Sequence, residues 1–207
     1  MRCRFITVAT PCMVLARPRP RQLGGVRRPT TLADAPGTAR PERGCEVSDR
    51  VHGDQATELE AIRQLKYAYF RTLDLKQFED LGALLTEDCT TSYEDGRSKL
   101  EGRRAVVEWL SKALGDPGIV TEHHGHHPEI TLTSDTTAKG TWYLQDRDVV
   151  PAADLQIGGT AFYADRYVKT PDGWRIAHTG YVRVFEERRT HSTLAVRSFT
   201  SRFGSPG

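Results

Sequence analysis

The period of the hydrophobic pattern changes once along this 207-residue chain, from about 3.6 residues before Gly118 to two residues after it. In residues 58–74 the apolar side chains recur at spacings of three and four, which predicts one buried face of a helix. That stripe consists of Ile62, Leu65, Tyr69 and Leu73. Lys66 and Arg71 lie off it.

Further segments extend this order of helices followed by strands. The pattern predicts helices at residues 78–85 and 103–114, with a short strand at 87–93 between them. After Gly118, alternation predicts strands at 124–133, 138–149, 159–169 and 174–187. Tight turns join neighbours at 134–136 and 170–173. The sequence therefore predicts an α+β domain, cone-shaped, with three N-terminal helices packed in a strongly curved antiparallel sheet and a cavity between them.

The domain is predicted to occupy residues 54–190, between a leader at 1–53 and a C-terminal tail at 191–207. The leader holds ten Arg, no Lys and four acidic residues. Its Arg- and Pro-rich composition cannot bury enough apolar surface to offset chain entropy, so it is predicted to be disordered. An export or import signal is the alternative interpretation, although the early apolar run is interrupted by Thr and Pro.

Composition narrows the classes of function. Without the leader the chain carries 19 basic and 23 acidic residues, so no clustered positive charge predicts nucleic-acid binding. No apolar run approaches the roughly 20 residues that span a bilayer, and no membrane association is predicted. Three of the four cysteines lie in the leader, leaving Cys89 as a predicted buried thiol. This cysteine usage favours a reducing, cytoplasmic location.

Two candidate site residues lie on the first predicted helix. Tyr69 lies on the apolar stripe, so its hydroxyl must find a partner in the interior. Asp74 ends the same helix five residues later. Each also has an ordinary structural explanation, a satisfied core tyrosine and a helix-terminal carboxylate respectively.

Four histidines fall within residues 123–127, which invites a metal-site interpretation. In an extended strand, however, His123 and His127 share one face while His124 and His126 share the other. Neither Glu122 nor Glu129 completes a recognised ligand spacing, so no metal site is predicted. A single histidine acting as a general acid or base is the stronger hypothesis, because its pKa lies near neutrality.

Asp146 continues an apolar face of its strand and must be paired if it is buried. A histidine on the adjacent strand is one predicted partner, in a His–Asp dyad; an ion pair with Arg147 or Arg166 is the other. Strict alternation from Trp174 places Arg183 outside the core, unless a bulge at Gly180 switches the faces of its strand. Nucleotide-binding loops and nucleophile elbows are absent from the sequence, and no cofactor is predicted.

Three segments of this chain resemble the SnoaL-like, nuclear-transport-factor-2-like superfamily. They are residues 65–74 (LKYAYFRTLD), 124–130 (HGHHPEI) and 140–146 (GTWYLQD). Within that superfamily the resemblance is closest to the bile acid 7α-dehydratases, and it continues through residues 91–96, 159–163, 172–174 and 179–183. It covers about 130 residues and none of the leader.

The resemblance implies a site and a reaction. The pocket residues of these dehydratases fall on Tyr69, Asp74, His123, Asp146 and Arg183. It implies cofactor-independent elimination of water from a hydrophobic, steroid-like hydroxy-ketone or its CoA thioester. His123 would be the base, held by Asp146, with Tyr69 as hydrogen-bond donor and with Asp74 and Arg183 contacting the substrate. An isomerase or cyclase and a non-catalytic binding domain are the alternatives, and a homo-oligomer, dimer or trimer, is expected.

Overall fold

The computed structural model describes residues 49–204, and side chains from residue 55 onward. The first 48 residues of the predicted leader lie outside this range. Its last five residues begin helix α1, which runs over Asp49–Asp74 and so starts earlier than the sequence pattern predicted. Helices α2 (Phe78–Ala83) and α3 (Arg103–Leu114) follow. No helix among residues 49–204 combines the length and the apolar character needed to cross a membrane.

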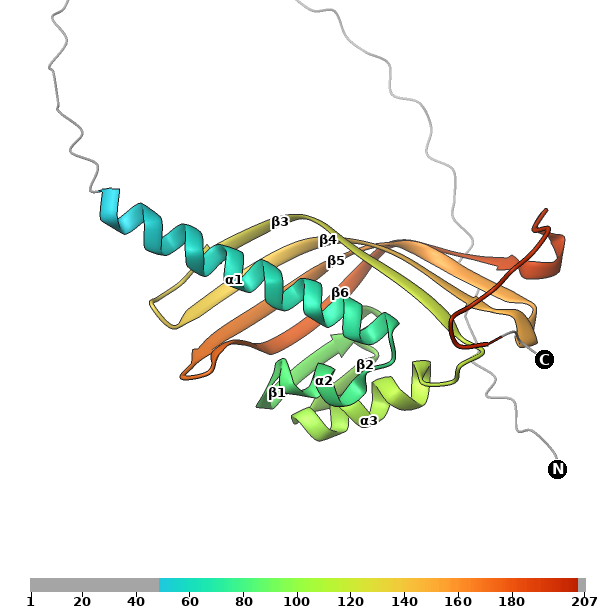
Figure 1. Cartoon of the computed structure of the whole chain (residues 1–207), viewed down its shortest axis with the longest axis horizontal. Helices are drawn as coiled ribbons and strands as arrows, with labels where there is room; N and C mark the ends of the chain where they lie inside the picture. The colour runs from blue at the N-terminus through green and yellow to red at the C-terminus, as the bar shows by residue number, and fades with distance from the viewer. Residues whose placement is uncertain (1–48, 205–207) are drawn as a thin grey trace, which may run out of the picture. The chain divides into compact units, whose positions relative to one another are not determined.

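Six strands form one curved sheet in the order β2-β1-β6-β5-β4-β3 (Figure 1). Their bounds are β1 Leu85–Tyr93, β2 Ser98–Glu101, β3 Val120–Leu132, β4 Thr137–Val150, β5 Leu155–Thr170 and β6 Gly173–Thr190. The architecture is mixed α+β, as predicted. The prediction of a wholly antiparallel sheet is wrong at one pair, because β1 runs parallel to β6. Parallel pairing needs a long crossover, which α3 and β2 to β5 supply here.

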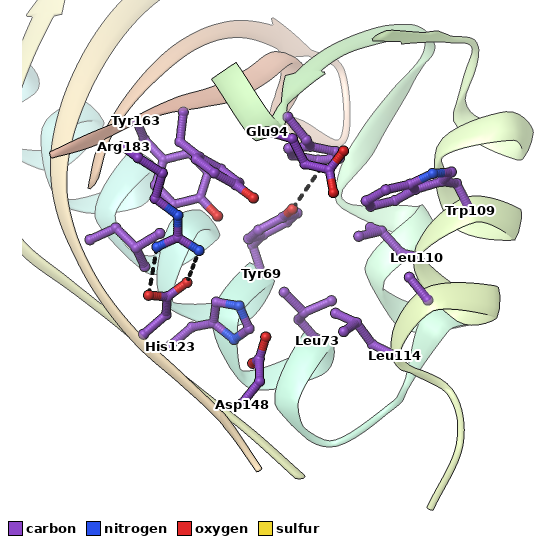
Figure 2. Close-up of a pocket in the computed structure, with 15 residues that line it drawn as sticks. Tyr69, Leu73, Glu94, Trp109, Leu110, Leu114, His123, Asp148, Tyr163 and Arg183 are labelled. Carbon is purple, nitrogen blue, oxygen red and sulfur yellow. Dashed lines mark hydrogen bonds and ion pairs between the residues drawn. The ribbon is translucent and has the colours of Figure 1, made fainter. Parts of the chain in front are cut away.

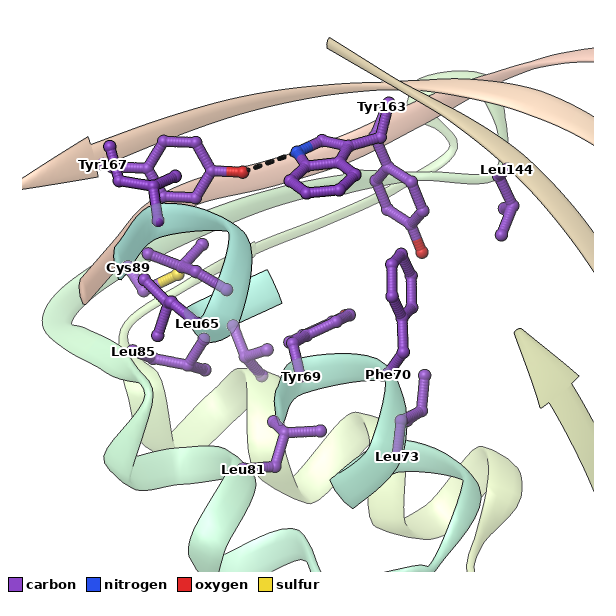
Figure 3. Close-up of a cluster of buried hydrophobic side chains, with 14 of the residues drawn as sticks. Leu65, Tyr69, Phe70, Leu73, Leu81, Leu85, Cys89, Leu144, Tyr163 and Tyr167 are labelled. Atoms are coloured by element: carbon purple, nitrogen blue, oxygen red, sulfur yellow. Dashed lines mark hydrogen bonds between the residues drawn. The ribbon is translucent and has the colours of Figure 1, made fainter. Parts of the chain in front are cut away.

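Helix α1 lies along one face of β3–β6, while α2, α3, β1 and β2 gather beside its C-terminal half (Figure 1). The predicted stripe of α1 is buried: Ile62, Leu65, Tyr69 and Leu73 all belong to the core. On the sheet, Trp142 is fully buried and donates from its indole nitrogen to the Tyr167 hydroxyl at 2.8 Å (Figure 3). Full burial of an aliphatic side chain such as Ile62, Leu65 or Leu73 contributes roughly 1.5–3 kcal/mol.

Lys66 is also fully buried, although it lies off the apolar stripe that predicted the buried face of α1. Its ammonium forms an ion pair with Asp165 of β5 at 2.8 Å, and both side chains are 0% exposed. The same ammonium lies 3.6 Å from the centre of the Tyr163 ring. Cys89 is buried nearby, as predicted, and burial raises the pKa of its thiol to about 12.

A bulge in β6 decides which way Arg183 points. Ile176 pairs with Tyr167, but His178 pairs with Arg166, so Ala177 is an extra residue on β6. The bulge reverses the faces, and Arg183 joins Trp174 on the inner side of the sheet. Strict alternation therefore placed Arg183 wrongly. The switch lies at Ala177 and not at Gly180, whose role is to let β1 approach: a Cβ there would lie 2.6 Å from the Ser92 carbonyl oxygen.

Candidate functional site

A cavity of about 200 Å³ lies between the C-terminal half of α1, helix α3 and the inner face of the sheet. Figure 2 shows that its two sides differ in character: Trp109, Leu110 and Leu114 of α3 form an apolar side, and the polar side chains face it. The polar lining residues are Tyr69, Tyr93, Glu94, His123, Asp146, Asp148, Tyr163, Tyr181 and Arg183. The cavity can thus bind a ligand whose apolar part packs against α3 and whose polar atoms point toward α1 and the sheet.

Asp74 holds His123 in place at the cavity wall. The Nδ1 atom of His123 lies 2.6 Å from Oδ1 of Asp74, and its backbone N–H donates to Oδ2 at 3.0 Å. The Thr121 hydroxyl donates to the same carboxylate at 2.8 Å. With Nδ1 engaged, Nε2 is the ring nitrogen available to a ligand. The α1 terminus therefore supplies the orienting carboxylate of a His–Asp dyad.

The predicted pairing of His123 with Asp146 is wrong. The two residues are direct cross-strand neighbours on β3 and β4, but the carboxylate of Asp146 is occupied elsewhere. Arg183 donates to both of its oxygens, Nη1 to Oδ1 and Nη2 to Oδ2, each at 2.7 Å. A fork-to-fork guanidinium pair satisfies the carboxylate more completely than one imidazole nitrogen could. Of the two arginines predicted as alternative partners, Arg147 pairs with Glu122 instead, and among the described residues Arg166 forms no ion pair with Asp146.

The charges around His123 set its pKa. Burial lowers the pKa of the imidazole, whereas the hydrogen bond to Asp74 and the negative charges of Asp74, Asp148 and Asp146 raise it. The net result is a pKa above the ordinary histidine value. An imidazole with a raised pKa is a stronger base.

Tyrosine hydroxyls gather opposite this dyad. The hydroxyls of Tyr69 and Tyr93 lie 2.9 Å apart, and the rings of Tyr163 and Tyr181 meet edge to face at 5.6 Å. Burial raises the pKa of all four phenols, so they remain protonated donors. Neutral hydrogen-bond donors that line a cavity can stabilise an oxygen that gains negative charge there. Tyr69 was predicted from the sequence; the other three were not.

Asp148 is a further site residue that the sequence analysis did not select. It lies two positions after Asp146 on β4, so both side chains point to the same face of the sheet. Burial raises the pKa of its carboxyl group. Figure 2 shows it beside His123. The alternation that selected Asp146 also applied to Asp148, and extending it by one step would have found this residue.

His124 and His126 lie on the opposite face of β3 from His123. His124 of β3 forms an ion pair with Glu122 at 2.8 Å, and its ring stacks on that of His126 at 5.7 Å. A bulge at His127 and Pro128 interrupts the pairing of β3 with β4. Within residues 49–204, no three His, Cys, Asp or Glu side chains converge in a way that could hold a metal ion.

Comparison with solved structures identifies the fold. A proposed scytalone dehydratase from Novosphingobium aromaticivorans superposes with a TM-score of 0.62 at 24% identity, covering 66% of this chain and 90% of the other. A hexachlorocyclohexane dehydrochlorinase, LinA type 3 from Novosphingobium barchaimii, gives a TM-score of 0.62 at 15% identity over 72% and 99%. At these identities the likeness concerns the fold alone.

Sequence comparison adds a relative and a family. The uncharacterized protein Rv2910c of Mycobacterium tuberculosis is 28% identical over 145 residues, which cover 69% of this chain and 90% of that protein. The family model for the SnoaL-like domain matches residues 54–180, more than half of the chain and every residue of the cavity except those of β6 beyond Gly180. The chain therefore belongs to the SnoaL-like domain family.

Proposed function

We propose that this protein is a cofactor-independent lyase that eliminates water from a small hydrophobic hydroxy-ketone. The observation that carries the proposal is the His123–Asp74 dyad: a carboxylate fixes Nδ1 of the imidazole and leaves Nε2 to a ligand in the cavity. Two of the structures with a similar fold are named for eliminations, one a dehydratase and one a dehydrochlorinase. Elimination next to a carbonyl needs a base for the C–H proton and donors for the enolate oxygen.

The residues of the cavity supply both requirements. Nε2 of His123 takes the proton from the carbon beside the substrate carbonyl, and Asp74 stabilises the imidazolium that forms. The electron pair moves onto the carbonyl oxygen, which accepts a hydrogen bond from the Tyr69–Tyr93 hydroxyl pair, in which one hydroxyl donates to the other. Expulsion of the β-hydroxyl then gives an enone and water. The apolar side chains of α3 hold the hydrocarbon part of the substrate and exclude solvent.

The size of the cavity favours a substrate with one or two rings. An apolar cavity of about 150 Å³ holds benzene, and this cavity measures about 200 Å³. A steroid has four fused rings and would have to extend through the opening of the cavity or widen it. The steroid-like substrate and the CoA thioester implied by resemblance therefore stay predictions that a substrate series can test.

The test of this function incubates wild type and His123→Ala with a β-hydroxy ketone such as 3-hydroxycyclohexanone. The mass and the ultraviolet absorption of the product are then measured. We expect the wild type to release water and the variant to lose about 10²–10⁴-fold in kcat/KM. A product of unchanged mass would assign the site to an isomerase. A ligand that binds tightly and is recovered unchanged would assign it to a binding domain. Full activity in the variant would remove His123 from the role of base.

We also propose that the protein assembles into a homo-oligomer through the outer face of its sheet. Tyr143, Phe162 and Val182 are register partners across β4, β5 and β6 and form one apolar row on the face opposite the cavity. Phe162 is 47% exposed and Val182 64% exposed. A contiguous apolar row of this kind is typical of an interface. Light scattering should give a dimer or trimer for the wild type and a monomer for Val182→Lys; a monomeric wild type would contradict the proposal.

A further inference from the structure

Three aspartates line or support one wall of the cavity, and they differ in how their carboxyl groups are satisfied. Asp74 accepts from the Thr121 hydroxyl and from the backbone N–H of His123, besides meeting its ring nitrogen. Asp146 accepts two guanidinium hydrogen bonds from Arg183. Asp148 differs from both: its Oδ1 atom is buried and has no hydrogen-bond partner among the described residues. A buried carboxyl oxygen without a donor is costly as an anion.

The charged and titratable groups that act on Asp148 come from several elements around it. His123 lies beside it on β3, Asp146 precedes it on β4, and Arg183 reaches in from β6. From α1 and the residues after it, Asp74 and Lys76 also act on it through their charges. Burial is the largest influence and raises the pKa of Asp148; the positive charges of His123 and Arg183 lower it, and Asp146 and Asp74 raise it again. The net direction is upward, toward the protonated acid.

Asp148 and His123 line the same cavity, and Figure 2 shows the two side chains beside each other on its wall. A ligand in the cavity can therefore contact a base and an acid together. Pairs of titratable groups whose surroundings differ in this way divide the acid and base roles of an active site.

We propose that Asp148 is a second catalytic residue, the general acid that protonates the departing hydroxyl. This inference rests on the proposed lyase function and specifies its substrate class as alcohols. His123 removes the C–H proton and becomes imidazolium, and the C–O bond breaks as the oxygen takes the proton of Asp148. The products are the enone and water, with Asp148 left as a carboxylate. Transfer of the proton from His123 to Asp148, directly or through water, restores the starting state.

The leaving group distinguishes this role from a structural one. Hydroxide is a poor leaving group and needs a proton as the C–O bond breaks, whereas acetate departs as a stable anion. Removal of the general acid should therefore slow elimination from an alcohol and spare elimination from its acetate ester. Removal of the base should slow both, because the C–H proton must leave in either reaction.

The experiment compares Asp148→Asn with the wild type on 3-hydroxycyclohexanone and 3-acetoxycyclohexanone, which give the same enone. We expect kcat/KM for the alcohol to fall about 10²–10⁴-fold and that for the acetate less than about tenfold. His123→Ala is the matched comparison and should slow both substrates. Asp135→Asn, at an exposed turn between β3 and β4, controls for the loss of a carboxylate and should change neither rate.

Each outcome bears on one claim. Equal losses for the alcohol and the acetate in Asp148→Asn would overturn the acid role, because they would make Asp148 a base or a structural residue. A wild type that converts neither substrate would overturn the proposed function itself. If Asp148→Asn does not fold, the pH profiles of the wild type decide: kcat for the alcohol should fall at high pH at which kcat for the acetate is retained, and parallel profiles would refute the proposal.

Discussion

Two of the acid–base pairs that connect helix α1 to the sheet differ in what their basic group faces. In the first, Asp74 of α1 holds His123 of β3 beside the cavity. In the second, Lys66 of α1 meets Asp165 of β5 at 2.8 Å in a region sealed from solvent. The first pair leaves a ring nitrogen free toward a ligand. The second makes its contacts inside the protein, where Lys66 meets Asp165, Thr179 and the rings of Tyr69, Phe70 and Tyr163.

The first pair can therefore act on a ligand, whereas the second pair can only stabilise the fold. Burial lowers the pKa of Lys66, while the charge of Asp165 raises it, so the ammonium depends on its partner to remain charged. Asp165 is supported in turn by the Tyr167 hydroxyl at 2.8 Å. Such closed networks favour one packing arrangement, and they are damaged when a single member is removed. The His123–Asp74 pair can lose a member with less structural cost because one side of it faces a cavity.

The largest expected effect follows from breaking the closed pair. Lys66→Ala leaves a buried carboxylate without its counter-charge, which typically costs about 3–5 kcal/mol of unfolding free energy. Urea denaturation measures this loss. The double variant Lys66→Met with Asp165→Leu is the control and should recover most of the stability, because it removes both charges together. A loss below about 1 kcal/mol in the single variant would show that solvent reaches the pair.

The second largest effect is expected on activity, when the pair beside the cavity is broken. Asp74→Asn should lower kcat/KM by about 10²-fold, equal to about 2.7 kcal/mol of transition-state stabilisation, because the imidazole loses its orienting charge. Unfolding free energy should fall by less than in Lys66→Ala. Thr121→Val removes only one hydrogen bond to Asp74 and serves as the milder control. Comparable activity in Asp74→Asn and wild type would show that His123 works without the dyad.

A smaller effect is expected at Tyr69. Tyr69→Phe removes one donor of a pair, and the Tyr93 hydroxyl, 2.9 Å away, can still reach the same substrate oxygen. We therefore expect about a tenfold loss in kcat, near the value of one hydrogen bond. Combining Tyr69→Phe with Tyr93→Phe should cost more than the sum of the single changes. Strict additivity would indicate that the two hydroxyls act on different atoms.

The two pairs also differ from the local features of the fold in whether the sequence predicts them. Local patterns predicted the bounds of α3 and the buried stripe of α1, because side-chain period alone determines them. The burial of Lys66 was not predicted, because a charged side chain off the apolar stripe is expected to be exposed. Its burial is explained by Asp165, which is distant in sequence but forms an ion pair with it. Partners distant in sequence, such as Asp74 for His123, depend on how α1 meets β3. No local pattern encodes that contact.

The direction of Arg183 could not be decided from the sequence for a related reason. One extra residue at Ala177 reverses the faces of β6, and Ala carries no mark of a bulge in sequence. Once Arg183 turns inward it takes Asp146, and the dyad that the sequence predicted cannot form. The short strand β2 and the parallel pairing of β1 with β6 also depend on long-range contacts.

The smallest expected effect is on the pH dependence of stability. His123 has a raised pKa in the folded protein, despite its burial, because the hydrogen bond to Asp74 and the neighbouring negative charges favour the imidazolium. A raised folded pKa means that the group's stabilising contribution is fully present below the unfolded pKa, about 6.5, and is lost as pH rises through the folded value. Subtracting the unfolding free energies of His123→Gln from those of wild type isolates this contribution. The difference should decline as pH rises above about 6.5. A difference that grows with pH would mean that burial outweighs Asp74, and that the imidazole is held neutral.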